Sequence, residues 1–307
     1  MSADPPAVFA GAVTLDAIAL VDRFPDPDER LVAEQLDYAG GGPAATAAVA
    51  AARLGVPAAF VGTVGDDPEG RRIVEDLRAE GVDVSGVTVA AGQSSGASVI
   101  VVDRQRGTRA ICTRPGPAPV LTSAADLLLS AEWVHVDHLG WSPVQTLLGG
   151  AKERRPMLAV DAGNPIPGFT FTGVDLYVPT VEALRRDHGD ADIDKLLDAA
   201  LAAGAGSVVA TDGPLGSYAA TAAGERYHAP GLKVEVISTL GAGDVFHGAL
   251  IAARMRRLPL GQCLAFANIA AALSCRGLDG RSAIPQYDEV AALLPSLTWT
   301  ESQGESR

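Results

Sequence analysis

The stretch Ser238–Leu250, with the sequence STLGAGDVFHGAL, places a turn of small residues directly before a predicted helix over Val245–Arg257. Such a turn leaves backbone N–H groups unpaired at the helix N-terminus, where the helix dipole adds positive potential. The stretch therefore predicts an anion site. Asp244 lies inside the same turn, although a carboxylate is of no use in holding an anion. A proton acceptor beside an anion site indicates transfer of a phosphoryl group to a hydroxyl.

Outward from this stretch, strand and helix patterns alternate between about residues 131 and 211. This rhythm predicts a parallel sheet with helices on both faces. The strands are expected at Trp133–Asp137, Met157–Asp161, Asp175–Val178 and Ser207–Thr211, with earlier strands at Ala7–Val13 and Ala58–Val64 and a late hairpin at Ser217–Thr221 and Arg226–Ala229. Further helices are expected over residues 40–55, Asp67–Gly81, Gly261–Ser274 and Tyr287–Leu294, and residues 298–307 are expected to fray.

Two segments break this rhythm. Residues 96–114 contain β-branched runs around a turn at Arg104–Gly107, which predicts a hairpin, and Leu31–Tyr38 alternates as an exposed strand does. We therefore expect one α/β domain over residues 1–307, with the strands of a small β lid inserted at about 15–39 and 95–115.

Composition narrows the function classes. The formal charge of −13 argues against binding of nucleic acid or of a membrane surface, because phosphate groups reward clustered Lys and Arg. The three cysteines, widely spaced, are expected to be free thiols, and the five histidines show no metal-ligand spacing, so no zinc site is expected. With no signal peptide or membrane-spanning stretch, a cytoplasmic enzyme is expected.

Common nucleotide-binding motifs are missing. The sequence has neither GxxxxGK[ST] nor a GxGxxG after the first strand, which argues against a P-loop enzyme and a Rossmann dehydrogenase. Two glycine-rich pieces, Gly40–Gly42 and Gly241–Asp244, each precede or open a helix and indicate two half-sites. Polar residues also follow predicted strands, where sites of α/β sheets lie: Asp16, Asp137, Asp161 and Thr211–Gly213.

These pieces resemble the PfkB/ribokinase carbohydrate kinases. The first family signature is similar to Gly41-Gly42 through Arg53-Leu54-Gly55, and the second to STLGAGDVFHGAL. Both signature stretches look most like the sulfofructose kinase branch. The resemblance implies a ribokinase-like three-layer α/β/α sandwich with a mostly parallel central sheet and a small β lid. It also implies ATP-dependent phosphorylation of a sugar, with Mg2+.

The resemblance assigns roles to individual residues. Asp244 matches the base that takes the proton of the sugar hydroxyl, and the amides of Ala242, Gly243 and Asp244, which follow Gly241, match the anion hole. Asp16, Gly41 and Gly42 match sugar-binding positions. Thr211, Gly213 and Gly216 match the turn near the nucleotide. Asn268 falls where the family often contacts adenine, although an Asn satisfied within the protein is an equal alternative.

Several positions depart from the family pattern. Thr46 stands where an Asn usually binds the sugar. Ser238 replaces an Asp that helps to hold a monovalent cation, so potassium dependence stays open. The Asn-x-x-Glu motif that organises magnesium is altered, and Glu182 is either its carboxylate in a shifted register or an ordinary Glu of a first helical turn.

The substrate stays open between alternatives. A ketohexose-like sugar is favoured. Among such sugars 6-deoxy-6-sulfofructose is a candidate, because Arg30 stands where the sulfofructose branch has a Lys. Arg109 and Arg114 of the lid are alternative partners for a sulfonate, and His138 could touch the sugar. A nucleoside kinase is disfavoured because Tyr38 is the one aromatic residue of the lid segments. A sensor without catalysis is the third reading. Exposed lid strands predict a homodimer formed through the lid.

Overall fold

The computed structural model describes residues 5–149 and 155–303 and contains two β-sheets. The larger sheet has ten strands in the order β14-β13-β12-β11-β10-β9-β8-β1-β4-β5. Their bounds are β1 (Ala7–Ala10), β4 (Ala58–Gly65), β5 (Asp83–Ala90), β8 (Trp133–Val136), β9 (Met157–Asp161), β10 (Leu176–Val178), β11 (Ser207–Thr211), β12 (Ser217–Thr221), β13 (Glu225–Ala229) and β14 (Thr300–Gln303). The strands from β5 to β11 in this order pair in parallel, and β12, β13 and β14 add an antiparallel edge.

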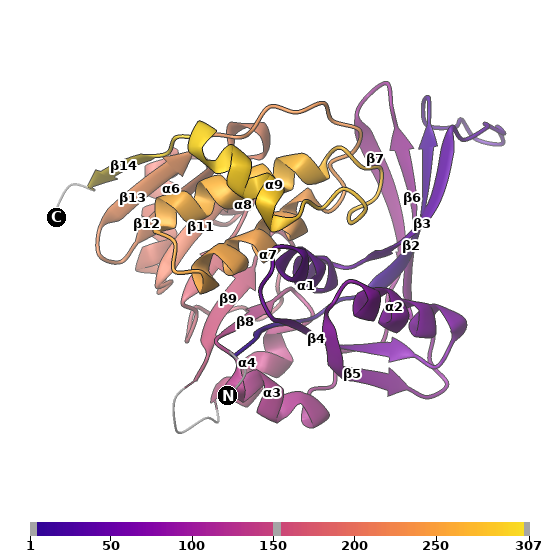
Figure 1. Ribbon diagram of the computed structural model, residues 1–307, viewed down its shortest axis with the longest axis horizontal. Coiled ribbons are helices and arrows are strands. Elements are labelled where there is room, and N and C mark those ends of the chain that lie inside the picture. The colour runs from indigo at the N-terminus through magenta and orange to yellow at the C-terminus, as the bar shows by residue number, and fades with distance from the viewer. Residues whose placement is uncertain (1–4, 150–154, 304–307) are drawn as a thin grey trace.

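Helices cover both faces of this sheet (Figure 1). One face carries α1 (Pro43–Arg53), α2 (Pro68–Ala79), α7 (Ala242–Met255), α8 (Leu260–Ser274) and α9 (Tyr287–Leu293). The other carries α3 (Ala125–Ser130), α4 (Trp141–Gly149), α5 (Val181–His188) and α6 (Ile193–Ala202). Successive residues of a strand supply the two cores in turn: Phe9 packs on the first face and Val8 on the second. The expected three-layer α/β/α sandwich is confirmed.

The small sheet is the lid. It contains β2 (Thr14–Val21), β3 (Gln35–Gly41), β6 (Gly96–Asp103) and β7 (Thr108–Arg114), in the order β3-β2-β6-β7. In Figure 1 these strands rise beside the helical body at the right of the view. A groove of about 510 Å³ separates the inner lid face from residues 235–239, and Arg109 Nη1 crosses it to donate to Thr239 Oγ1 at 2.9 Å.

Helix α1 lies unusually close to α7, and small residues explain why. A Cβ on Gly248 would sit 2.2 Å from the backbone oxygen of Ala47, so the two helices approach through a position that only glycine can occupy. The eight residues from Ala44 to Ala51 are buried, and six of them are alanine. This contact holds α7, whose first turn carries the predicted anion site, against α1, which the glycine-rich segment precedes.

Several helix and strand boundaries differ from those predicted from the sequence. Helix α7 begins at Ala242, so Asp244 lies in its first turn rather than before it. The first strand ends at Ala10, and β2, which belongs to the lid, starts at Thr14. Strand β5 was not predicted. Residues 300–303, expected to fray, form edge strand β14, while residues 304–307 lie outside the described part of the chain.

Within the described ranges, each helix is too short or too polar to cross a bilayer.

Candidate active site

The N-terminus of α7 presents free backbone donors. Gly241 precedes the helix with φ +74°, and no side chain caps the helix within the described structure. The amides of Gly243 and Asp244 donate to no backbone carbonyl among the described residues, while the Ala242 amide reaches Thr239 O at 3.3 Å. Two amides without a partner among the described residues and one weakly engaged amide therefore give the start of α7 the donors that the predicted anion site needs. A Cβ on Gly241 would lie 2.7 Å from the Gly280 Cα, so this turn also requires glycine.

Asp244 is a stronger base than an ordinary carboxylate. Burial raises its pKa to about 7, the carboxylates of Asp161 and Asp137 act in the same direction, and His247 and Arg281 oppose them. The sequence alone gave no reason to expect more than the ordinary value near 3.9. A base whose pKa lies near the working pH combines a large ionised fraction with real proton affinity, as general base catalysis requires.

The three glycines before α1 make room for two charged side chains. A Cβ on Gly40 would lie 2.2 Å from Arg281 Nη1, and a Cβ on Gly41 would lie 2.0 Å from Asp16 Oδ2. Gly42 has φ +90°, and a Cβ there would meet the Ala12 oxygen at 2.5 Å. The family resemblance assigned Gly41 and Gly42 to the sugar. In the structure the glycines first allow Asp16 and Arg281 to lie against the backbone.

Asp16, on the inner face of the lid, carries an unpaired acceptor. Its side chain is 7% exposed, and its Oδ1 atom has no hydrogen-bond partner among the described residues. Burial raises its pKa, while hydrogen bonds from Thr14 and Ser98 and the charge of Arg281 act against that rise. A buried polar atom without a partner is uncommon in a folded protein, so Oδ1 is the atom best placed to accept a ligand hydroxyl.

Arg281 is a site residue that the sequence reading missed. It follows α8, is 6% exposed, and donates from Nε to Thr46 Oγ1 (3.2 Å) and from Nη2 to Gly41 O (2.9 Å). Burial lowers its pKa to about 10, with the charges of Asp16 and Asp244 opposing the fall, so the guanidinium stays charged at neutral pH. The available signal was a lone Arg beside Gly280 in a turn after a helix, which is too common to single out.

Thr46 and Asp137 hold the site together. Thr46 is 1% exposed and accepts from Arg281, so its hydroxyl already has one protein partner. Asp137 accepts four backbone N–H groups, from Ala12 (2.7 Å), Ala44 (3.2 Å), Leu139 (2.9 Å) and Gly140 (3.1 Å). It therefore organises the turns around the site rather than facing a ligand. Next to it, His138 is half-buried, and its Nδ1 lacks a partner among the described residues.

Arg30 lies apart from the other predicted sugar residues. It is exposed in the connection that leaves the lid beyond the Leu20–Gln35 pair, whereas Asp16 lies near the opposite end of the same strand pair, where Thr14 faces Gly41. The two alternative cations form hydrogen bonds within the protein: Arg109 donates to Thr239 Oγ1, and Arg114 Nη2 donates to Ser95 O at 2.9 Å. Arg30 is therefore placed away from Asp16, while Arg109 and Arg114 are engaged by hydrogen bonds within the protein.

The predicted nucleotide turn follows β11. Thr211 ends the strand, and Gly213 and Gly216 have φ +52° and +98°. A Cβ on Gly216 would lie 2.1 Å from Ala229 O, so this turn needs glycine to pack against the end of β13. Asn268 is buried and donates from Nδ2 to Ala229 O (2.9 Å) and Pro230 O (3.2 Å). Its amide is thus used inside the protein, which favours the structural alternative over adenine contact.

Two departures from the family pattern have local explanations. Thr180 caps α5 by accepting the Ala183 amide at 2.9 Å, and Glu182 is exposed in the first turn of that helix. Ser238 is buried, and its hydroxyl accepts the Leu240 amide at 3.1 Å. The first arrangement leaves one exposed carboxylate at the predicted magnesium position. The second supplies no charge at the predicted monovalent-cation position.

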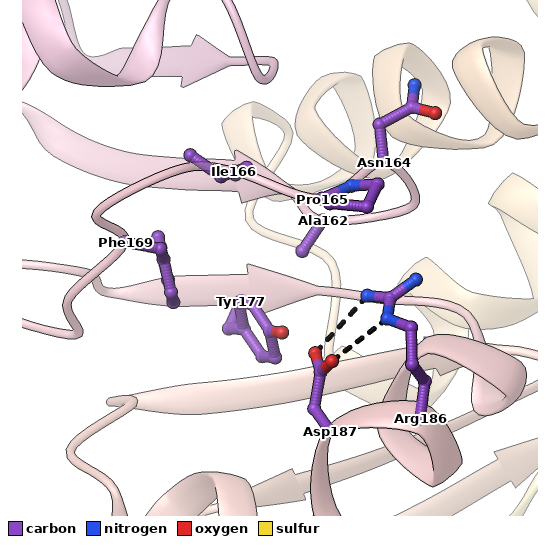
Figure 2. A pocket seen from close by; sticks show the side chains of 8 residues that line it. All are labelled: Ala162, Asn164, Pro165, Ile166, Phe169, Tyr177, Arg186 and Asp187. Carbon is purple, nitrogen blue, oxygen red and sulfur yellow. Dashed lines mark hydrogen bonds and ion pairs between the residues drawn. The ribbon is translucent and has the colours of Figure 1, made fainter.

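A pocket of about 180 Å³ opens at the end of β9 (Figure 2). Phe169 and Tyr177 form one side, and Arg186 and Asp187 from α5 form another. Figure 2 shows these two charged side chains directed at each other, and Arg186 Nε donates to Asp187 Oδ1 at 2.9 Å. Asp187 therefore balances the charge of Arg186 within this pocket.

Contrary to the sequence reading, two histidines do meet. His135 of β8, Asp161 of β9 and His247 of α7 are all buried, and one ligand-type atom from each lies within 4.8 Å of the others. Their positions, far apart in sequence, converge only because β8 and β9 are neighbours beneath α7.

Comparison with known proteins agrees with this geometry. The chain is 29% identical to the ATP-dependent ribose-1-phosphate kinase of Halopiger xanaduensis over 300 residues, which cover 93% of this chain and 96% of the relative. It is 30% identical to a fructokinase of Klebsiella pneumoniae over 308 residues, covering 90% and 97%. The ribokinase structure from Thermotoga maritima superimposes with a TM-score of 0.81 at 26% identity, covering 95% and 99%. The profile of the pfkB family carbohydrate kinases matches residues 6–149 and 170–286. The chain therefore belongs to the pfkB family and is a carbohydrate kinase.

Proposed function

We propose that this kinase phosphorylates a hydroxyl of a free ketohexose-like sugar, with Asp244 as the base. The observation that carries the proposal is the buried Oδ1 of Asp16, which has no partner among the described residues, on a side chain that lies with Arg281 against the glycines that precede α1. A carboxylate acceptor and a guanidinium donor are complementary to neighbouring sugar hydroxyls, which both donate and accept hydrogen bonds. Paired opposite charges suit a neutral ligand better than an anionic one.

The residues divide the chemical work. Asp16 and Arg281 would hold the sugar. Asp244 would accept the proton of the attacking hydroxyl while the hydroxyl oxygen bonds to the γ-phosphorus, the bond from that phosphorus to the bridging oxygen breaks, and ADP leaves. The free amides of Gly243 and Asp244 stabilise the charge on the phosphoryl oxygens. Phosphoryl transfer depends mainly on such placement and charge stabilisation. The lid excludes water, a competing acceptor, by covering the sugar with the inner face that carries Asp16.

The phosphoryl donor and its metal fit the remaining positions. The glycine turn at Thr211–Gly216 and the amides of α7 offer backbone contacts to ATP, which supplies the γ-phosphoryl group. Glu182 is the carboxylate available for Mg2+, an ion that keeps several waters and binds through one or two carboxylates plus phosphates. Arg281 adds a fixed positive charge near Asp244 that needs no bound ion.

Two alternative substrates have less support. A nucleoside needs an aromatic surface for its base, but Tyr38 pairs with Ala17 and therefore points away from the face that carries Asp16. A sulfonated sugar needs cations, and Arg30 lies at the far end of the lid.

A coupled assay of ADP release tests the proposal. Fructose and other ketohexoses should be turned over with higher kcat/KM than ribose, ribose 1-phosphate, sulfofructose or adenosine. A preference for sulfofructose would reinstate Arg30. A preference for adenosine, or turnover of none of these compounds, would contradict the proposal and favour the nucleoside kinase or the sensor.

We further propose that two copies associate through the outer lid face. This face consists of alternate residues that pair across all four strands: Leu36, Tyr38, Ala17, Ala19, Val99, Val101, Ala110 and Cys112. Three large members are each 58% exposed: Leu36, Tyr38 and Val99. The centre of this sheet face is therefore apolar, with Arg114 at one end and Thr108 at the other, and an exposed apolar patch with a polar rim is typical of an interface. A second copy offers the same surface, as a two-fold dimer requires.

A further inference from the structure

A buried ion pair lies beneath the proposed base. His247 follows Asp244 by one turn of α7, and its Nε2 is 3.3 Å from Asp161 Oδ1 at the end of β9. The side chains of His247 and Asp161 are only 7% and 8% exposed. Asp161 Oδ1 also accepts the Gly163 amide at 2.9 Å. The mechanism above uses neither side chain, although burying two charges is costly unless they interact well.

A neighbouring histidine shows what Asp161 does to His247. His135 is 1% exposed, its ring centroid lies 5.1 Å from that of His247, and neither ring nitrogen has a partner among the described residues. Burial lowers the pKa of His135 to about 3, and the charge of His247 adds to this effect. Burial acts on His247 too, but the charge and hydrogen bond of Asp161, with the charge of Asp244 adding to them, more than offset it and raise the pKa of His247. The charge of Asp161 acts on both imidazoles, but only His247 is also in hydrogen-bond contact with it, which keeps His247 charged beside a neutral His135.

We propose that His247 is a positioning residue for Asp244: the Asp161 carboxylate 3.3 Å away keeps His247 protonated, and this buried cation offsets part of the repulsion that Asp161 and Asp137 exert on the ionised Asp244. This inference rests on the proposed function of Asp244 as the base. His247 lies on the same helix one turn away, so its charge acts on Asp244 through the protein interior, where water screens little.

The charges around Asp244 explain why a cation is needed there. Asp161 and Asp137, from the ends of adjacent strands, both disfavour a third carboxylate. Opposing them are His247 on α7 and Arg281 after α8, while His135 on β8 is uncharged. Four charged groups shift the pKa of Asp244. If His247 is removed, the carboxylates of Asp161 and Asp137 remain, and Arg281 is the one cation of the four that opposes them. The base would then hold its proton to higher pH.

The pH dependence of kcat/KM tests this role, because it reports ionisation of the free enzyme. His247→Gln should move the acid limb upward by roughly one pH unit, since a nearby opposite charge shifts a carboxyl pKa by about that much or more. In the Asp161→Asn background, His247→Gln should cause no further upward shift, because the imidazole is then neutral. His135→Phe is the matched control and should leave the acid limb in place. An unchanged or lowered limb in His247→Gln, or an equal shift in both backgrounds, would overturn the proposal.

A second measurement needs no turnover. NMR of 15N-histidine-labelled protein should show His247 still charged above its ordinary pKa of about 6.5 and neutral there in Asp161→Asn. Its signal can be assigned by elimination, through variants of the other four histidines. A neutral His247 in the wild type would refute the ion pair. A charged His247 in a protein that phosphorylates no sugar would instead refute the proposed function alone.

The metal content of the purified protein distinguishes a buried ion pair from a metal site. The three side chains could ligate one ion, so the purified protein should be measured for zinc and other transition metals. Less than about 0.1 equivalent supports the ion pair. One equivalent that is lost in His135→Phe would show a metal site and overturn the proposal.

Discussion

The proton affinity of Asp244 gives a prediction that needs no substitution. With a pKa of about 7, only about one Asp244 in a hundred is ionised at pH 5, so kcat/KM should fall about 100-fold from its plateau. With an ordinary pKa of 3.9 the loss at pH 5 would be only about a tenth. The assay is initial-rate ADP release at subsaturating sugar, with coupling enzymes checked at each pH. A profile that stays flat down to pH 5 would refute the electrostatic argument.

The same burial makes Asp244 costly to the folded protein. Because its pKa is raised in the folded state, ionisation of Asp244 destabilises the fold. This destabilisation is absent below about pH 4 and complete above about pH 7. The gap between about 3.9 and about 7 corresponds to at most roughly 4 kcal/mol, less what solvent screens at this partly exposed side chain. Asp244→Asn removes the proposed base, so it should lower kcat by about 10²- to 10⁴-fold, the usual contribution of a general base. It should also raise Tm at pH 8 but not at pH 4. An Asn variant with near-wild-type turnover, or with no gain in Tm at pH 8, would contradict this reasoning.

Two further substitutions test the sugar site and the lid. Gly40→Ala places a Cβ 2.2 Å from Arg281 Nη1 and so displaces the guanidinium. The KM for the sugar should rise about 10- to 100-fold, as expected if one hydrogen bond from a charged donor is lost. Gly149→Ala is the control: its Cβ meets no atom within 4 Å, and KM should stay unchanged. Equal KM values for both variants would remove Arg281 from the sugar site. Val99→Glu, on the outer lid face, should convert a dimer to a monomer in sedimentation experiments, while Val32→Glu, at a 90% exposed position outside that face, should not. A wild-type monomer would end the dimer proposal.

Local patterns predicted the body of the fold well and the lid less well. The strands from β8 to β11 stand out because each is a short apolar run between helical patterns. Strand β5 was missed because only Gly86 of its eight residues is buried. The boundary between β1 and β2 was missed because Gly11–Val13 reads as a continuation of the apolar run, while in the structure the chain passes there from the body to the lid.

The site shows a similar division. Asp244 and the glycines were accessible because their motifs are contiguous in sequence. Arg281 and the Asp161–His247 pair were not, because their roles depend on contacts between residues 240 and 86 positions apart. The ordinary appearance of Arg30 and Asn268 likewise gave no sign that one would lie beyond the lid and the other would bind Ala229.

Asp137 has a consequence for how the lid moves. Its carboxylate fastens Ala12, two residues before β2 begins, and Ala44, three residues after β3 ends. Two of the chain segments that join lid and body are thus pinned to one buried atom, Oδ2. Rotation of the lid must pivot beside that atom, which places Asp16 and Gly41 close to the axis and the distant lid tips on the longest arc. The sugar contacts would stay nearly fixed while the cover swings, so the substrate could be gripped before the site is sealed.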